Sequence, residues 1–150
     1  MNIYSVLLLI IGFISLTGCE YGPNASRGFS LPEGDAANGQ QVLVKHKCLA
    51  CHTLEGVSDD TIEPELATLV QLGGRTTKVT TYAELVTSII NPSHKIAQGY
   101  MLDSISESGK SKMRNYNDVM TVTELVDLVT FLQPTYKVKP NEYTPYGQYY

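Results

Sequence analysis

The segment Cys48-Leu49-Ala50-Cys51-His52 brings two thiols and an imidazole together within one C-x-x-C-H pattern. This pattern is typical of covalent haem attachment, in which each thiol bonds to one vinyl group of the porphyrin and the histidine binds the iron. A structural zinc site would need two more Cys or His ligands at short spacing, and the sequence offers none. A thioredoxin-like dithiol would need a βαβ context, which the chain also lacks. The motif therefore predicts one covalent haem c, attached through Cys48 and Cys51, with His52 as an axial iron ligand.

The N-terminal segment has the character of an export signal. The apolar run at residues 6–16 is too short and too early for a core element and fits the hydrophobic region of a signal peptide. Leu16-Thr17-Gly18-Cys19 follows it and resembles the lipobox of bacterial lipoproteins, in which the cysteine becomes the lipidated first residue. An uncleaved membrane anchor is the alternative. Both interpretations predict an exported protein, anchored to a bacterial membrane and facing the periplasm or the cell exterior.

Length and charge limit the remaining possibilities. The chain has 150 residues, a net charge of −4 and three cysteines, which the lipid on Cys19 and the haem would use completely. A mildly acidic chain without a basic stripe is not expected to bind nucleic acid. We expect a signal peptide at 1–18, a flexible tether at 19–34, one haem domain at 35–134 and a tyrosine-rich tail at 135–150.

Helical patterns frame the predicted domain. Asp35 is a candidate N-cap for a helix that runs to the haem motif, and Gly39 inside it predicts close approach of another helix. Thr121 and Glu124 form a capping-box pattern before an apolar helical face that Pro134 ends. A third helix is predicted at 81–90.

The segments between these helices lack a helical period. The Gly73-Gly74 pair lies between two short Val- and Thr-rich runs, at 67–72 and 75–81, and this arrangement predicts a β-hairpin. Residues 93–120 contain few periodic apolar positions. We expect them to form a long functional loop that supplies the distal wall of the haem site.

The second axial ligand decides between electron transfer and chemistry on small molecules, because a bound thioether blocks exogenous ligands and stabilises Fe(II). Of the four methionines, Met1 belongs to the predicted signal, which leaves Met101, Met113 and Met120. Met120 directly precedes the last helix, where core packing is the simpler role. His94 would instead give bis-histidine ligation.

Over residues 35–133 the chain resembles the class I (mitochondrial-type) monohaem cytochromes c of bacteria. The resemblance rests on the first helix with Gly39, the haem motif, and a methionine followed by a last helix with Phe131. It implies a mainly α, cytochrome c-like helical domain around one covalent haem, here with a small inserted β-hairpin. It also implies that Met113 is the second axial ligand, although Arg114 replaces the proline that commonly follows this methionine.

The same resemblance implies several supporting roles. The carbonyl of Pro64 would accept a hydrogen bond from His52, and Arg75 would pair with a haem propionate. Tyr116 and Asn117 would belong to the hydrogen-bonding surroundings of the methionine sulfur.

The expected function is one-electron transfer outside the cytoplasm by a carrier that is not an enzyme. Redox partner proteins would meet the exposed haem edge, and a rim of basic residues would steer acidic partners: Lys45, Lys47, Lys95, Lys110, Lys112 and Arg114. One alternative is a fixed haem subunit of a larger respiratory or dehydrogenase complex. Another is a peroxidase-like enzyme or gas sensor with an open iron site.

Overall fold

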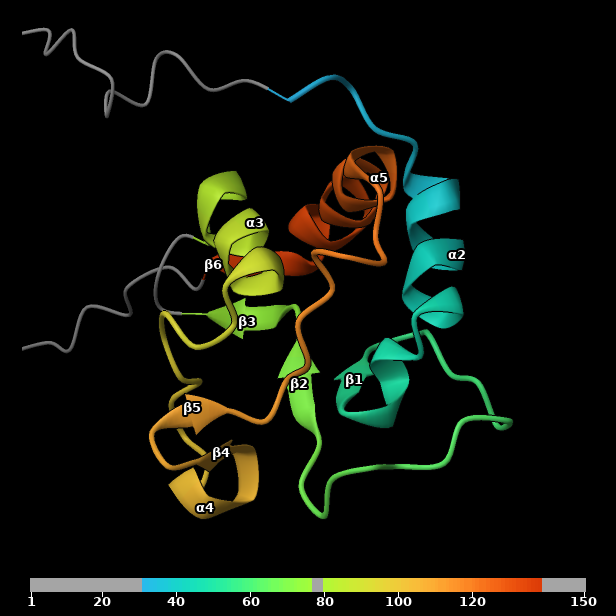
Figure 1. Cartoon of the computed structure of the whole chain (residues 1–150). Coiled ribbons are helices and arrows are strands. Elements are labelled where there is room, and N and C mark those ends of the chain that lie inside the picture. The colour runs from blue at the N-terminus through green and yellow to red at the C-terminus, as the bar shows by residue number, and fades with distance from the viewer. Residues whose placement is uncertain (1–30, 77–79, 139–150) are drawn as a thin grey trace, which may run out of the picture. The chain divides into compact units, whose positions relative to one another are not determined.

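The computed structural model describes residues 31–76 and 80–138. This part of the chain contains four α-helices and three two-stranded sheets (Figure 1). The helices are α2 (Ala36–Lys45), α3 (Tyr82–Ile90), α4 (Leu102–Ile105) and α5 (Val122–Leu132), with 3-10 turns η2 (Cys48–Ala50) and η3 (Gln133–Thr135). The strands are β1 (His52–Leu54), β2 (Val70–Leu72), β3 (Gly74–Thr76), β4 (Ser106–Glu107), β5 (Lys110–Ser111) and β6 (Tyr136–Val138). Helical residues make up 38% of this part of the chain, so the fold is less helical than the sequence suggests.

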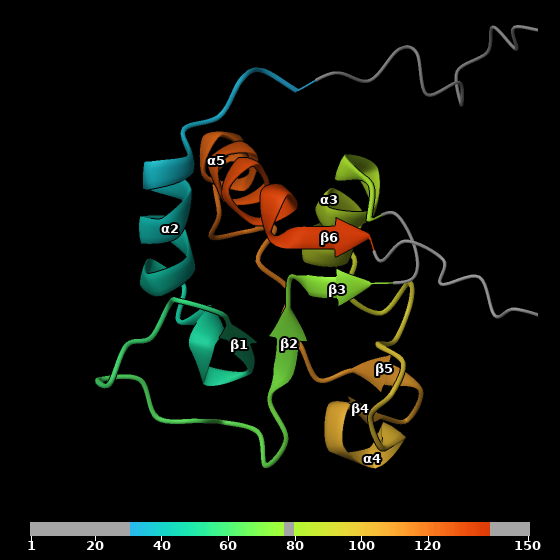
Figure 2. The same ribbon diagram turned by 180° about the vertical axis from the view of Figure 1, so that it is seen from behind.

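Helices α2 and α5 cross at very short range, as Figures 1 and 2 show from opposite sides. A Cβ at Gly39 of α2 would lie 2.1 Å from the backbone oxygen of Asp127 and 2.6 Å from Cβ of Phe131 on α5. The main-chain N–H of Asp35 donates to Oδ1 of the buried Asp127 at 2.7 Å. The predicted close approach at Gly39 is therefore confirmed, and its reason is backbone contact with α5.

The predicted helix starts are confirmed by their caps. The Asp35 carboxylate accepts hydrogen bonds from the first turn of α2. Thr121 and Glu124 form a reciprocal capping box at α5, and Thr81 and Glu84 form another at α3. Buried apolar side chains of α2, α3 and α5 then meet in one core: Val42, Leu43, Leu85, Val86, Ile89, Val126, Leu128, Val129 and Leu132.

The hairpin predicted around Gly73-Gly74 is wrong. Strand β2 pairs in parallel with β1, and β3 pairs in parallel with β6 from the end of the described chain. The two glycines have φ values of 67° and 81°, and they turn the chain from one sheet to the other. A Cβ at Gly73 would lie 2.4 Å from Oγ1 of Thr135, so the packing also requires glycine there. The Gly-Gly pair marks a corner because each flanking run finds a partner elsewhere in the chain.

The long loop predicted at 93–120 contains regular structure. It includes α4 and an antiparallel pair, β4 and β5, joined at Ser108 and Gly109. Both linking residues have positive φ values, 50° and 77°, as a tight two-residue hairpin turn requires. In the sequence, the Ser108-Gly109 dipeptide is a turn signal from which this hairpin could have been predicted.

Within the segment expected as the tail, regular structure follows α5 directly, as η3 and β6 up to Val138. The predicted signal peptide at 1–18, the predicted lipidation residue Cys19, most of the predicted tether and the predicted tail from 139 onward lie outside the described residues. No helix of the described part is long and apolar enough to span a bilayer.

Candidate haem site

The attachment motif is presented by a single tight turn after α2. Lys47 adopts a left-handed conformation with φ 53° and starts η2, whose backbone bonds run from Ala50 N to Lys47 O and from Cys51 N to Cys48 O. Leu49 and Ala50 are buried, whereas Cys48 and Cys51 both line one cavity. The turn therefore points the two thiols toward the same space, as attachment to one porphyrin edge requires.

His52 starts strand β1 and is oriented by the neighbouring strand. Its Nδ1 lies 3.1 Å from the carbonyl oxygen of Val70, its register partner in β2. Because a carbonyl only accepts, Nδ1 carries the proton and Nε2 is left as the free lone pair for a metal. Burial lowers the pKa of His52, which favours the neutral ring that metal binding needs.

The structure gives this hydrogen bond a different acceptor from the one predicted. Pro64 is exposed on the loop between β1 and β2, and Val70 supplies the carbonyl instead. The physical reason is the parallel pairing of β1 with β2, which the sequence pattern did not reveal. Val70 is thus a site residue that sequence reasoning missed, and its only signal was a β-branched residue in a short extended run.

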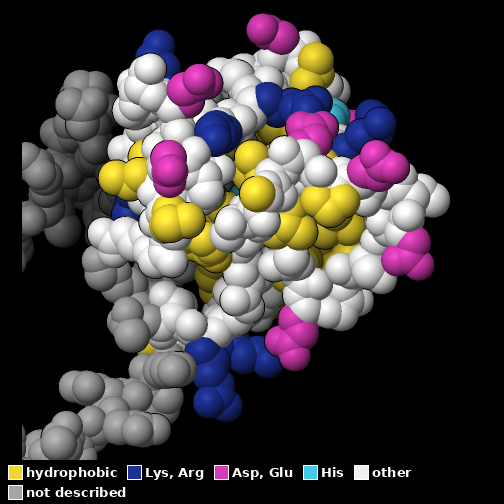
Figure 3. All heavy atoms as spheres, turned by 90° about the horizontal axis from the view of Figure 1, so that it is seen from below, with side chains coloured by type: hydrophobic (Ala, Val, Ile, Leu, Met, Phe, Trp, Pro, Cys, Tyr) yellow, Lys and Arg dark blue, Asp and Glu magenta, His cyan; other side chains and the backbone are white. Residues whose placement is uncertain are grey.

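The thiols and the imidazole open into a cavity of about 370 Å³. Its walls come from α2, α3, α5 and the segment around Met113, and they are mainly apolar; they include Leu43, Leu66, Leu85, Ile89, Ile96, Ile105, Leu128 and Leu132. Seen from the end at which α4 lies in Figure 1, apolar side chains occupy the middle of the surface and charged side chains surround them (Figure 3). A mostly apolar pocket beside two thiols and a histidine fits a porphyrin with one exposed edge.

Two of the candidate second ligands line this cavity, and two do not. Met113 and Met120 share the cavity with His52. Met101 has 73% of its surface exposed and lies outside the lining. His94 is also exposed and outside the lining, and its Nδ1 contacts the carbonyl of Asn91 at 2.8 Å. Of the three candidate methionines, the cavity lining therefore includes Met113 and Met120 and leaves out Met101.

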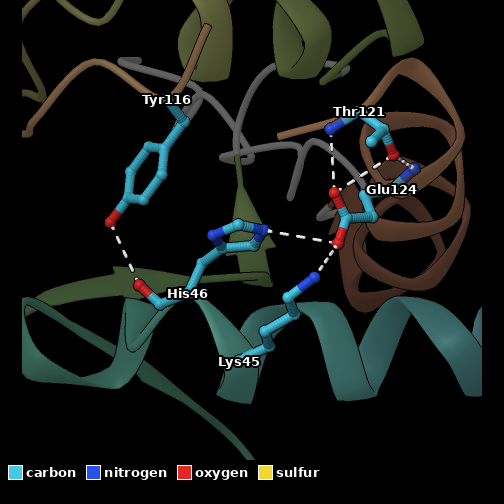
Figure 4. Close-up of polar contacts among 5 residues, drawn as sticks. All are labelled: Lys45, His46, Tyr116, Thr121 and Glu124. Carbon is cyan, nitrogen blue, oxygen red and sulfur yellow. Dashed lines mark hydrogen bonds and ion pairs between the residues drawn. The ribbon is translucent and has the colours of Figure 1, made fainter. Parts of the chain in front are cut away.

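Tyr116 lines the cavity, but its hydroxyl has another partner. It donates to the backbone carbonyl of His46 at 3.2 Å, and the two rings meet edge to face at 5.6 Å between centroids (Figure 4). Asn117 is exposed and donates to the carbonyl of Ile90 at 3.0 Å. Both residues attach the segment after Met113 to other elements, and neither contact directs a donor to the methionine sulfur.

Arg75 does not reach the cavity. It is exposed on β3, and its register partner on β6 is Lys137. The neighbouring register pair joins Gly74 to Tyr136, a cavity-lining residue, so Arg75 belongs to the opposite face of the strand pair. The sequence analysis assigned Tyr136 to the tyrosine-rich tail, and the structure brings it to the wall of the cavity.

The thiols do not have the surroundings of a thiolate metal site. Burial raises the pKa of Cys48 to about 11 and raises that of Cys51 as well, so both thiols are protonated at neutral pH while no group is bound to them. Among the described residues, no three His, Cys, Asp or Glu side chains group together as a metal site would need. Two thiols and one histidine therefore suit a porphyrin, which brings its own iron, better than a zinc ion that needs four ligands from the protein.

Half of the predicted basic rim is paired with acidic side chains. Three of its six members contact carboxylates: Lys45 with Glu124, Lys95 with Glu84, and Arg114 with Glu65. Lys112 donates to the backbone carbonyls of Asp103 and Ser104.

The sequence model of the cytochrome c family matches residues 36–135, and the chain belongs to this family. The match covers the whole distance from the first residue of α2 to the end of η3. The family binds haem c covalently, and Cys48, Cys51 and His52 have the spacing of its attachment motif. Haem-based electron transfer with redox partner proteins follows from this membership. No curated protein and no solved structure matches the chain.

Proposed function

We propose that the protein is a single-haem electron carrier whose iron is ligated by His52 and Met113. The observation that carries the proposal is that both residues line the same apolar cavity as the two attachment thiols. The bound haem supplies one-electron redox chemistry at its iron. The protein's own residues hold the porphyrin through Cys48 and Cys51, orient the imidazole through Val70, and keep water away with apolar walls.

Met113 is preferred over Met120 because of how each is held. Met120 donates its backbone N–H to Tyr116 at 2.9 Å and directly precedes the N-cap of α5, so the cap and turn geometry fix its position. Met113 lies in an irregular segment between β5 and α5, and its N–H donates to Oγ of Ser111 at 3.1 Å. This is also the position that the class I resemblance assigns to the ligand.

The test is the near-infrared spectrum of the ferric holoprotein, in which thioether ligation gives a weak characteristic band. Wild type is expected to show the band, and Met113→Leu is expected to lose it. Met120→Leu is the matched control, because it removes the other cavity-lining sulfur, and it should retain the band. Loss of the band in Met120→Leu alone would transfer the ligand role to that residue.

We further propose that the protein is exported and anchored by lipid on Cys19. The support is the apolar run at 6–16 followed by Leu16-Thr17-Gly18-Cys19. Stable anchoring by lipid chains needs two signals or chains, which lipoprotein modification would provide. Mass spectrometry of the native N-terminus tests this directly: a lipidated Cys19 supports it, and an unmodified residue at the mature N-terminus contradicts it.

A further inference from the structure

An ion pair connects the segment of Met113 to the haem-attachment turn. Nη2 of Arg114 lies 2.7 Å from Oε2 and 2.9 Å from Oε1 of Glu65. The backbone N–H of Glu65 donates in turn to the carbonyl of Ala50, inside the attachment turn, at 2.7 Å. Two consecutive hydrogen-bonded contacts therefore join the residue after Met113 to the turn that carries both thiols.

The pair lies at the surface beside the attachment cysteines. The side chains of Arg114 and Glu65 are 57% and 49% exposed, and both charges act electrostatically on Cys51. Arg114 and Glu65 come from positions 49 residues apart in the chain. The contact is thus a long-range connection across the exposed side of the site, and local helix geometry does not impose it.

Other contacts hold the same segment farther from Met113. Tyr116 donates to the carbonyl of His46, and Asn117 donates to the carbonyl of Ile90. These two contacts fix the side of the segment that leads into α5. Arg114 alone among these three residues adjoins Met113 in sequence, so its contact most directly limits the movement of that methionine.

We propose that the Glu65–Arg114 pair is a clasp that holds Met113 in place against the attachment turn and so limits exchange of the methionine for outside ligands. This rests on the proposed function, in which Met113 binds the iron. Arg114 and Glu65 are positioning residues, because they act through the Met113 segment and do not themselves line the cavity. An exposed ion pair is weak, so its loss should increase opening only severalfold.

The charges of Glu65 and Arg114 give a second measurable effect, opposite shifts in the reduction potential of the haem, which a change in packing alone would not produce. A positive charge near the haem favours Fe(II), and a negative charge favours Fe(III). Arg114→Gln should therefore lower the reduction potential and Glu65→Gln should raise it. A purely structural loosening would shift the potential in the same direction in both variants.

The test follows imidazole binding to the ferric holoprotein, with loss of the near-infrared thioether band as the signal. We expect Arg114→Gln and Glu65→Gln each to accelerate binding about two- to fivefold, and the double variant to be no faster than the faster single variant. The charge-reversed pair, Glu65→Arg with Arg114→Glu, should restore much of the wild-type rate. Lys45→Gln, which breaks the ion pair with Glu124 between α2 and α5, is the control and should leave the rate unchanged.

Wild-type rates in both single variants, or additive effects in the double variant, would overturn the clasp while leaving Met113 ligation intact. A wild-type protein without the thioether band would overturn the proposed ligation and the clasp together. The first result is read from the rate at which the thioether band is lost, and the second from whether wild type shows that band at all, so the two failures remain distinguishable.

Discussion

The α2–α5 crossing and the Met113 segment are held together by different means. At the crossing, Gly39 lets two helix backbones touch, and fully buried side chains such as Leu43 and Val129 fill the space around them. The Met113 segment has no regular structure of its own and is fixed by separate side-chain hydrogen bonds from Arg114, Tyr116 and Asn117. Stability is therefore concentrated in the crossing, where the buried contacts are densest. The proposed ligand is carried by a part of the fold that can move at lower cost.

The largest expected effect comes from closing the space at Gly39. Gly39→Ala places a Cβ 2.1 Å from a backbone oxygen that cannot rotate away, so the helices must separate. We expect the free energy of unfolding of the holoprotein to fall by about 3 kcal/mol. Chemical denaturation measures this, with Gln40→Ala at the exposed neighbouring position as the control. A loss as small as that of the control would show that the crossing is not tightly packed.

A smaller effect is expected from the Tyr116 hydroxyl. Tyr116→Phe removes its hydrogen bond to the His46 carbonyl and should cost about 1 kcal/mol of unfolding free energy. Tyr82→Phe is the matched control, because the buried Tyr82 hydroxyl has no hydrogen-bond partner within the described residues. The control should be neutral or slightly stabilising. Equal losses in the two variants would contradict the role given to the His46 contact.

Acid should weaken the junction between α2 and α5 through Glu124. Hydrogen bonds from Lys45 and from Thr121 lower the pKa of this carboxyl from 4.5 to about 2 (Figure 4). A lowered native pKa means that the carboxylate stabilises the fold above pH 4.5 and that this contribution disappears as the pH falls toward 2. Wild type should therefore be more stable than Glu124→Gln at neutral pH, and the difference should shrink across this window. A difference that stays constant down to pH 2 would contradict the shift.

The smallest stability effect is expected at the Glu65–Arg114 clasp. Because the pair is exposed, Arg114→Gln should change the unfolding free energy by less than about 1 kcal/mol. The same variant should nevertheless accelerate ligand exchange at the iron. The pair would then affect the Met113 segment without contributing much to overall stability, unlike the α2–α5 crossing. A loss of stability as large as that in Gly39→Ala would contradict this account, because it would mean that the pair stabilises the fold as strongly as the α2–α5 crossing does.

The two regions also differ in how far the sequence predicts them. The crossing was predictable because Gly39, the capping box at Thr121 and the apolar face of α5 are local signals with a helical period. The attachment motif was predictable because its chemistry depends on spacing within five residues.

The pairing of short strands was not predictable in the same way. Strand β1 depends on β2, and β3 depends on β6, which lies about sixty residues later in the chain. The Gly73-Gly74 pair is compatible both with a hairpin turn and with a turn that leads from one sheet to another. The pairing of β2 with β1 and of β3 with β6 decides between the two. For the same reason the sequence did not predict that Val70, and not Pro64, supplies the carbonyl next to His52. It also did not predict that Arg75 lies away from the cavity.

The central claim is that His52 and Met113 together ligate the haem, and NMR of the ferrous holoprotein labelled with methyl-13C methionine tests it most directly. The ring current of the porphyrin displaces the methyl resonance of a bound methionine far upfield. We predict one such resonance in wild type, its disappearance in Met113→Leu and its persistence in Met120→Leu. Absence of the displaced resonance from wild type, or its loss only in Met120→Leu, would contradict the account.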